Sequence, residues 1–259
     1  MALFSQWWML QRMGYQLGQN SFKRRLLDSS NDLEKHLLRS QQLIASEIRK
    51  RNPKSVAFLG SGWLLDIPLN ELLGTNTEIC LIDITHPKRI IHRYKKLPNI
   101  KLVEMDITGG AVKWAWDCAK GKRKLLDLNI LLQMGEQAVS SVANNYQFIV
   151  SINTLSQLHV PIEDYLVSKK RINDTERLQL SQMIHQGHVN GLPKGRSLII
   201  SDTEAEFYDD ENFLSHTSPR VFVDLSGLMF IAKWEWAFGN NYTFNPYYKV
   251  LYNTSAYLK

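Results

Sequence analysis

The chain has 259 residues, of which 44% are hydrophobic, 22% charged and 10% aromatic. This balance is typical of a globular protein and excludes a disordered, collagen-like or low-complexity chain. The net charge is +6, but residues 1–54 contain ten Lys and Arg against four Asp and Glu, whereas residues 55–259 contain 21 of each. The neutral remainder therefore lacks the excess of cations that nucleic-acid binding requires.

The two cysteines, Cys80 and Cys118, are too few for a disulfide framework or a four-cysteine zinc site. We therefore expect a reducing, cytoplasmic location and no bound metal. No apolar run of about 18 residues is present, so no transmembrane segment is expected. The first residues also lack the pattern of a secretory signal.

Two helices are predicted in residues 1–52, which we expect to form a helical extension of a domain over residues 53–259. Residues 3–17 carry an apolar stripe with basic residues elsewhere, and residues 31–50 keep roughly helical spacing until Pro53 ends the pattern. The first helix either packs on its own domain or on a second copy of the chain, or lies on an anionic membrane surface.

From residue 55 onwards, short apolar runs alternate with longer mixed segments. The runs that predict buried strands cover 55–60, 78–83, 101–106, 147–153 and 197–202. Runs at 228–238 and 247–258 have no helix between them and predict an antiparallel hairpin. The pattern indicates an α/β fold, a Rossmann-like, seven-stranded and mostly parallel sheet with a C-terminal antiparallel hairpin.

A glycine turn follows the first predicted strand, as Gly60-Ser61-Gly62. Glycine at this place lets the backbone approach a ligand at the carboxyl edge of the sheet. The second strand ends in Asp83, followed by Ile84. A carboxylate there can accept hydrogen bonds from the ribose hydroxyls of a nucleoside, so we assign both residues to nucleoside binding.

The third strand ends in Asp106 and Ile107 at the same edge, which completes a site for an adenosine cofactor. A dinucleotide would need a further glycine where Leu65 stands, and Asp66 would oppose its pyrophosphate. The phosphate-binding loop of nucleoside triphosphates is absent from the sequence. S-adenosylmethionine, whose tail carries cationic groups, fits these residues better.

The strand order, the terminal hairpin and these motifs resemble class I S-adenosylmethionine-dependent methyltransferases over residues 50–259. The resemblance implies that the turn from Gly60 to Gly62 lines the methionine part of the cofactor. It further implies that Asp83 binds the ribose and that Asp106 with Ile107 flanks the adenine. Residues 151–154, which end the fourth strand, would lie beside the methyl group, so the resemblance adds two cofactor-binding candidates, Ser151 and Asn153.

Two residues depart from the family pattern. Phe58 stands where the family has an acidic residue before the first glycine, and Leu64 stands where it has a third glycine. Asp66 either replaces the missing acid as a cofactor ligand or caps the following helix. This variant of the motif also shows some resemblance to nicotianamine synthase-like proteins.

Methyl transfer needs a nucleophile in line with the methyl group and in some cases a general base. Asn153 and His159 follow the fourth strand and are the catalytic candidates, His159 because its ordinary pKa lies near neutrality. The alternative is that His159 only caps or packs. We expect His185 and His188 at a solvated helix end, and residues 204–211 in an acidic loop beside the site.

The prediction is therefore a methyltransferase that uses S-adenosylmethionine and acts on a small-molecule acceptor. Three alternatives stay open. The chain either binds S-adenosylmethionine for aminocarboxypropyl transfer, or binds it only as a nucleoside sensor, or acts on nucleic acid through the basic helices of residues 1–52. The basic helices either cover the cofactor site, join the subunits of a homo-oligomer or touch an anionic surface.

Overall fold

The computed structural model describes residues 2–15, 31–122, 129–237, 245 and 247–259. The strands are β1 (Ser55–Leu59), β2 (Glu78–Asp83), β3 (Ile100–Glu104), β4 (Phe148–Ile152), β5 (Ser197–Tyr208), β6 (Leu214–Pro219), β7 (Met229–Ala237) and β8 (Lys249–Leu258). The helices are α1 (Ala2–Arg12), α3 (Asn31–Arg51), α4 (Leu69–Leu72), α5 (Lys88–Tyr94), α6 (Ala111–Ala119), α7 (Asn129–Ala143), α8 (Val160–Ser168) and α9 (Asp174–Gly191). None of these helices is both long and apolar enough to cross a membrane.

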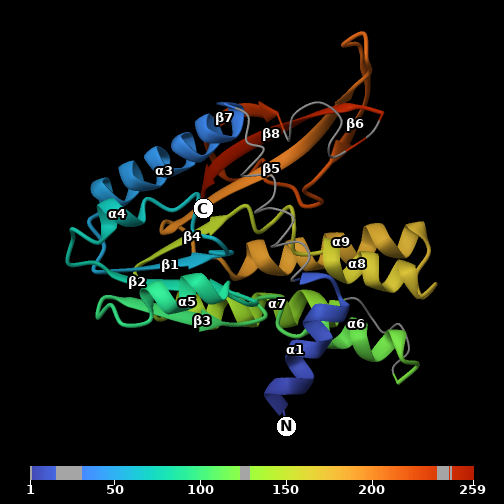
Figure 1. Cartoon of the computed structure of the whole chain (residues 1–259), viewed down its shortest axis with the longest axis horizontal. Helices are drawn as coiled ribbons and strands as arrows, with labels where there is room; N and C mark the ends of the chain where they lie inside the picture. The colour runs from blue at the N-terminus through green and yellow to red at the C-terminus, as the bar shows by residue number, and fades with distance from the viewer. Residues whose placement is uncertain (1, 16–30, 123–128, 238–244, 246) are drawn as a thin grey trace.

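The strands form one mixed sheet with the order β3-β2-β1-β4-β5-β8-β7 (Figure 1). The five strands from β3 to β5 are parallel, and β8 runs antiparallel between β5 and β7. This arrangement confirms the predicted α/β fold with its C-terminal antiparallel strands. Because parallel strands end at one edge, the ends of β1 to β4 lie side by side.

The sheet also contains a strand that the sequence did not predict. β6 pairs antiparallel with the second half of β5 and projects from the rest of the sheet (Figure 1). The expected acidic loop over residues 204–211 is therefore wrong, because residues up to Tyr208 belong to β5. Their backbone is held on both sides, by β6 and by β8.

Helices cover both faces of the sheet. On one face, α3, α4 and α5 bury apolar side chains against β1, β2, β4 and β5. On the other face, α7 and α9 bury Val139, Val142 and Val189 against the same strands. Two residues of α3, Ile44 and Ile48, belong to the first core. The division between residues 1–52 and 53–259 stays a prediction, but α3 supplies part of the hydrophobic core.

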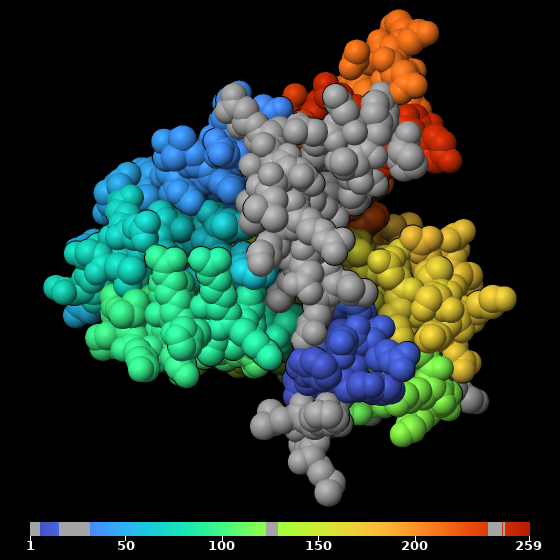
Figure 2. All heavy atoms as spheres, in the orientation of Figure 1, coloured from blue at the N-terminus to red at the C-terminus, as the bar shows by residue number. Residues whose placement is uncertain are grey.

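A third apolar cluster joins α1, α6 and α8 with parts of α7 and α9. Leu10 and Met13 are buried there together with Trp114 of α6. The ring of Trp8 contacts Trp116 edge-on at 5.4 Å. Figure 2 shows α1, in dark blue, packed on this face of the molecule. The described part of the first helix thus packs on its own domain, the first of the alternatives expected for it.

Candidate functional site

The turn after β1 needs its two glycines, Gly60 and Gly62, for different physical reasons. Gly60 and Gly62 have positive φ angles of 80° and 40°. A Cβ atom at Gly60 would lie 1.9 Å from Thr154 Oγ1, so this glycine allows the turn to pack on the segment after β4. A Cβ atom at Gly62 would meet only Asp83 Oδ2, at 3.7 Å. Gly62 therefore serves the backbone conformation and leaves space beside the carboxylate.

Asp83, the last residue of β2, is hydrogen-bonded to this turn. The backbone N–H of Gly62 donates to Asp83 Oδ2 at 2.8 Å, and that of Thr85 donates to Oδ1 at 3.5 Å. Burial raises the pKa of Asp83 to about 6, although these hydrogen bonds act in the opposite direction. The structure thus brings together two of the predicted cofactor residues.

Asp106 and Ile107 follow β3, as predicted, but both have structural partners. The backbone N–H and the hydroxyl of Thr108 both donate to Asp106 Oδ1, at 3.0 and 2.5 Å. Thr108 Oγ1 also accepts from the N–H of Ala111, the first residue of α6, so Asp106 helps to order the start of that helix. Ile107 is buried in the core under the sheet, and Ile84 packs against the cluster of α1 and α6.

Tyr15 brings the N-terminal segment to the same edge. The residue is half-buried and packs against the cluster that contains Ile84. Burial, and then the negative charges of Asp106 and Asp83, raise the pKa of Tyr15 well above its ordinary value. The phenol therefore lies within the field of both predicted nucleoside-binding carboxylates, a proximity that the sequence did not indicate.

Asp66 and Asn153 meet on the other side of the glycine turn. Asn153 has a left-handed φ of 49°, and its Nδ2 donates to Asp66 Oδ1 at 3.3 Å. His36 Nε2 of α3 lies 3.4 Å from the same oxygen, while His36 Nδ1 accepts from Trp234 Nε1 at 3.0 Å. Asn153 Oδ1 is buried and has no hydrogen-bond partner within the described part of the chain. An acid and an unpaired carbonyl oxygen thus lie next to each other at the end of β4.

The hydroxyls of Ser61 and Ser151 are each hydrogen-bonded to a buried histidine. Ser61 Oγ lies 3.0 Å from His86 Nε2, and Ser151 Oγ lies 2.8 Å from His188 Nε2, all four residues being buried. Burial lowers the pKa of His188 to about 4. The expectation of a solvated helix end is wrong, because α9 packs under the sheet and leaves His185 and His188 0% and 1% exposed.

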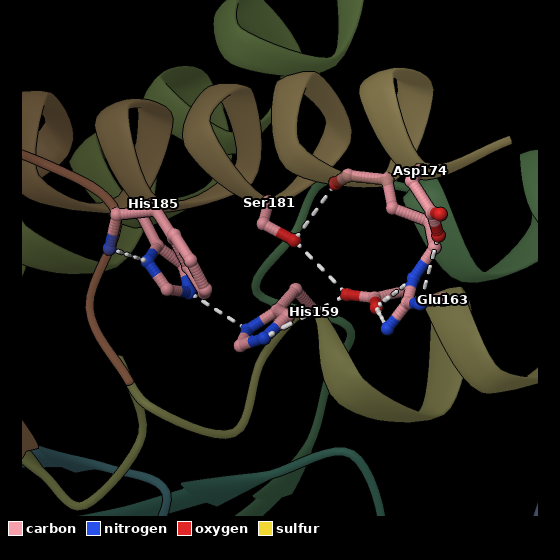
Figure 3. A network of polar contacts seen from close by, with 7 residues as sticks. His159, Glu163, Asp174, Ser181 and His185 are labelled. Carbon is pink, nitrogen blue, oxygen red and sulfur yellow. Dashed lines mark hydrogen bonds and ion pairs between the residues drawn. The ribbon is translucent and has the colours of Figure 1, made fainter. Parts of the chain in front are cut away.

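His159 belongs to a buried hydrogen-bonded chain (Figure 3). The backbone N–H of Phe222 donates to His185 Nδ1 at 3.0 Å, so the proton of the neutral His185 ring is on Nε2. That nitrogen donates to His159 Nδ1 at 2.9 Å. The proton of His159 is therefore on Nε2, which lies 3.8 Å from Glu163 Oε2. Glu163 in turn accepts from Arg177 Nε at 2.6 Å.

This arrangement bears on the predicted role of His159 as a base. Burial, and then the charges of Arg220 and Arg177, lower the pKa of His159 to about 4. Its only unprotonated nitrogen is occupied by His185. His159 does not present a free lone pair to a substrate in this conformation, and its catalytic role stays a prediction, as does that of Asn153.

A hollow in the described structure lies beside this edge rather than on it. It has a volume of about 600 Å³ and is enclosed by α3, the segment after Gly62 and α5. Gln41, Trp63 and Tyr94 line it, and Asp83 and Asp106 do not. Within the described ranges, no group of three or more His, Cys, Asp or Glu side chains is placed to hold a metal ion.

Comparison with known proteins finds ten similar chains among solved structures, two of which are as follows. A 1,6-didemethyltoxoflavin N1-methyltransferase from Burkholderia thailandensis, solved with 1,6-didemethyltoxoflavin and S-adenosylhomocysteine, is 10% identical, with a TM-score of 0.39 over 95% of this chain and 84% of that one. The N-methyltransferase NodS from Bradyrhizobium japonicum is 11% identical, with a TM-score of 0.36 over 87% of this chain and 94% of that one. No protein-family model and no curated protein sequence matches the chain.

Neither structure supports the expected likeness to nicotianamine synthases. The strand topology identifies the fold. The parallel strands have the order β3-β2-β1-β4-β5, and the sheet ends in the antiparallel pair β8 and β7. By this strand order, the chain has the fold of class I S-adenosylmethionine-dependent methyltransferases.

Proposed function

We propose that the protein binds S-adenosylmethionine at the ends of β1 to β4 and transfers its methyl group to a small-molecule acceptor. The observation that carries the proposal is the hydrogen bond between Gly62 and Asp83, which joins the glycine turn to the predicted ribose ligand. Asp106 follows the neighbouring strand, so three adjacent strand ends present one nucleoside-binding edge.

The residues present at this edge fit the cofactor. The carboxylate of Asp83 accepts the ribose hydroxyls, and Asp106 lies where the resemblance puts the adenine. Asp66 and the unpaired Asn153 Oδ1 are acceptors for a cationic ammonium group. Asp66 then replaces the acid that the family has at the position of Phe58, which is buried in the core of this chain.

S-adenosylmethionine, when bound, supplies a methyl group on a positively charged sulfur that a nucleophile can displace. The contribution of the chain is to bind and orient this group by hydrogen bonds and to hold the acceptor close to it. The neutral charge of residues 55–259 favours a small acceptor over nucleic acid. The two cysteines, free and buried, favour a reducing compartment such as the cytoplasm.

Calorimetric titration tests the proposal. S-adenosylhomocysteine is expected to bind the full chain more tightly than NAD⁺, and formation of S-adenosylhomocysteine from S-adenosylmethionine with small amines or hydroxyl compounds is expected to show turnover. Binding without turnover across such acceptors would favour the nucleoside-sensing alternative. Equal or weaker binding than that of NAD⁺ would overturn the proposed cofactor.

A further inference from the structure

Arg220 is a cation near the carboxyl edge that has no counter-ion among the described residues. It follows β6, and its backbone N–H donates to Thr203 O at 2.9 Å, within the irregularity of β5. Its guanidinium lies 5.4 Å from the ring centroid of Tyr252. Among the residues that the structure describes, Arg220 forms no ion pair, and its Nε is buried without a hydrogen-bond partner.

Two anchors place Arg220 beside the segment that follows β4. Phe222, two residues further on, donates its backbone N–H to His185, which is bonded to His159. The charge of Arg220 also contributes to the lowered pKa of both histidines, after burial. Arg220 therefore lies on the β4–β5 side of the sheet edge, away from the carboxylates that end β2 and β3.

A second polar group without a partner lies over the same strand. Ser156 is 1% exposed, and its backbone N–H donates to Ser201 Oγ of β5 at 3.2 Å. Ser201 is two residues from Thr203, which holds Arg220, a separation of about 7 Å along a strand. Ser156 Oγ has no hydrogen-bond partner in the described structure. An unpartnered hydroxyl and an unpaired guanidinium thus both belong to residues that are held near the middle of β5.

None of the three acids of β5, Asp202, Glu204 and Glu206, forms an ion pair with Arg220 in the described structure. Asp202 Oδ1 accepts from Trp236 and Thr254, and the carboxylate of Glu206 accepts from Tyr208 and Asn253. Guanidinium pairs with carboxylate and phosphate oxygens through two parallel N–H donors, and a serine hydroxyl can add a third. The chemistry of the unpaired groups suits a ligand with an oxyanion.

We propose that Arg220, assisted by Ser156, binds an oxyanion carried by the methyl acceptor, which makes the acceptor an anionic small molecule. The proposal rests on the proposed function for the identity of this ligand as an acceptor. The oxyanion is a carboxylate or a phosphate, and the experiment distinguishes the two.

The test is calorimetric binding of benzoate and of phenyl phosphate to the full chain at constant ionic strength, with and without saturating S-adenosylhomocysteine. One of the two anions is expected to bind the wild-type protein, and Arg220→Gln is expected to weaken it by about tenfold or more. Arg220→Lys retains the charge but lacks the two parallel N–H donors of a guanidinium. Its affinity for the anion is expected to lie between that of the wild type and that of Arg220→Gln. Arg89→Gln, which removes the same charge from the exposed surface of α5, is the matched control.

Binding of neither anion by the wild-type protein, or equal affinity of Arg220→Gln and wild type, would overturn the oxyanion site. S-adenosylhomocysteine affinity is measured on the same samples and is expected to be unchanged in Arg220→Gln. Failure of the wild-type protein to bind S-adenosylhomocysteine would instead contradict the proposed function. The two failures are therefore distinguishable.

Discussion

The backbone N–H of Gly62 donates to the carboxylate of Asp83 at 2.8 Å, although 21 residues separate them. The turn after β1 and the end of β2 therefore hold each other in position. A ligand that forms hydrogen bonds with Asp83 lies against the open side of Gly62, where the absent Cβ leaves space. The two sequence motifs thus act as one structural unit.

Replacement of Asp83 by Asn is expected to weaken S-adenosylhomocysteine binding by about tenfold to a hundredfold, because a hydrogen bond to a charged group is worth about 1.5–3 kcal/mol. The amide keeps the size and one acceptor oxygen, so the fold is expected to survive. Titration calorimetry measures the affinity, and Asp210→Asn, at an exposed turn, is the control. Unchanged affinity would remove Asp83 from the proposed site.

The affinity is also expected to depend on pH near the pKa of Asp83. Burial raises this pKa to about 6, and ribose hydroxyls donate only to the ionised carboxylate at full strength. Affinity is therefore constant above pH 7 and falls by up to about tenfold per pH unit below pH 6. Titrations from pH 5 to 8 test this, and the Asp83→Asn variant is expected to show a flatter profile. Identical profiles would assign the dependence to another group.

The two glycines are expected to respond differently to alanine. Gly60→Ala places a methyl group 1.9 Å from Thr154 Oγ1 and 2.9 Å from Ile152 O, so a loss of more than about 3 kcal/mol of stability is expected. Gly62→Ala costs only the strain of a positive φ, about 1 kcal/mol. Urea unfolding compares both variants. A Thr154→Ala substitution added to Gly60→Ala is expected to recover part of the loss, and a larger loss for Gly62→Ala would contradict the account.

Much of the parallel sheet was predictable, because each buried strand is a short apolar run. The ends of the first two strands are also marked, by Gly60 in a turn of positive φ and by the carboxylate of Asp83. The conformation of Leu64 also agrees with the family pattern. It has a φ of 63°, the left-handed conformation for which the family pattern has glycine. The second half of β5 could not be predicted, because Glu204 and Glu206 are typical of a solvated loop. Amino-acid composition does not show that β6 and β8 both pair with the backbone of this segment.

Contacts between distant side chains could not be predicted in this way. His159 and His185 are 26 residues apart and meet because the start of α8 packs against α9. The three-residue spacing of His185 and His188 indicates a shared helix face but not which element covers it. Ser151 was assigned to the cofactor from its position, and only the structure shows its bond to His188.

The buried histidines are expected to make the fold sensitive to acid. The pKa of His159 is lowered from 6.5 to about 4, so the unfolded chain takes up a proton between these values that the folded chain excludes. Stability is therefore lost as pH falls from 6.5 to 4, by up to about 3 kcal/mol for this residue. The raised pKa of Asp83 acts in the opposite direction below pH 6.

A comparison of variants separates the effect of His159 on acid stability from that of Asp83. Urea unfolding of wild type and His159→Gln at pH 7.5 and pH 5 is expected to show a smaller acid loss for the variant, whatever its stability at pH 7.5. His92→Gln, which removes an exposed histidine of α5, is the matched control and is expected to keep the wild-type loss. An equal acid loss in His159→Gln would show that His159 is protonated without penalty in the folded chain.

Tyr15 is expected to slow the release of a bound nucleoside, because the charges of Asp106 and Asp83 act on its phenol and the nucleoside is proposed to bind at these two carboxylates. Tyr15→Ala is expected to increase the dissociation rate of S-adenosylhomocysteine by about tenfold, the effect of removing a half-buried aromatic contact. Tyr15→Phe keeps the ring and is expected to release the ligand at nearly the wild-type rate. Stopped-flow tryptophan fluorescence measures these rates, with the exposed Tyr247→Ala as control. If Tyr15→Ala and wild type release the ligand equally fast, the N-terminal segment does not cover the site.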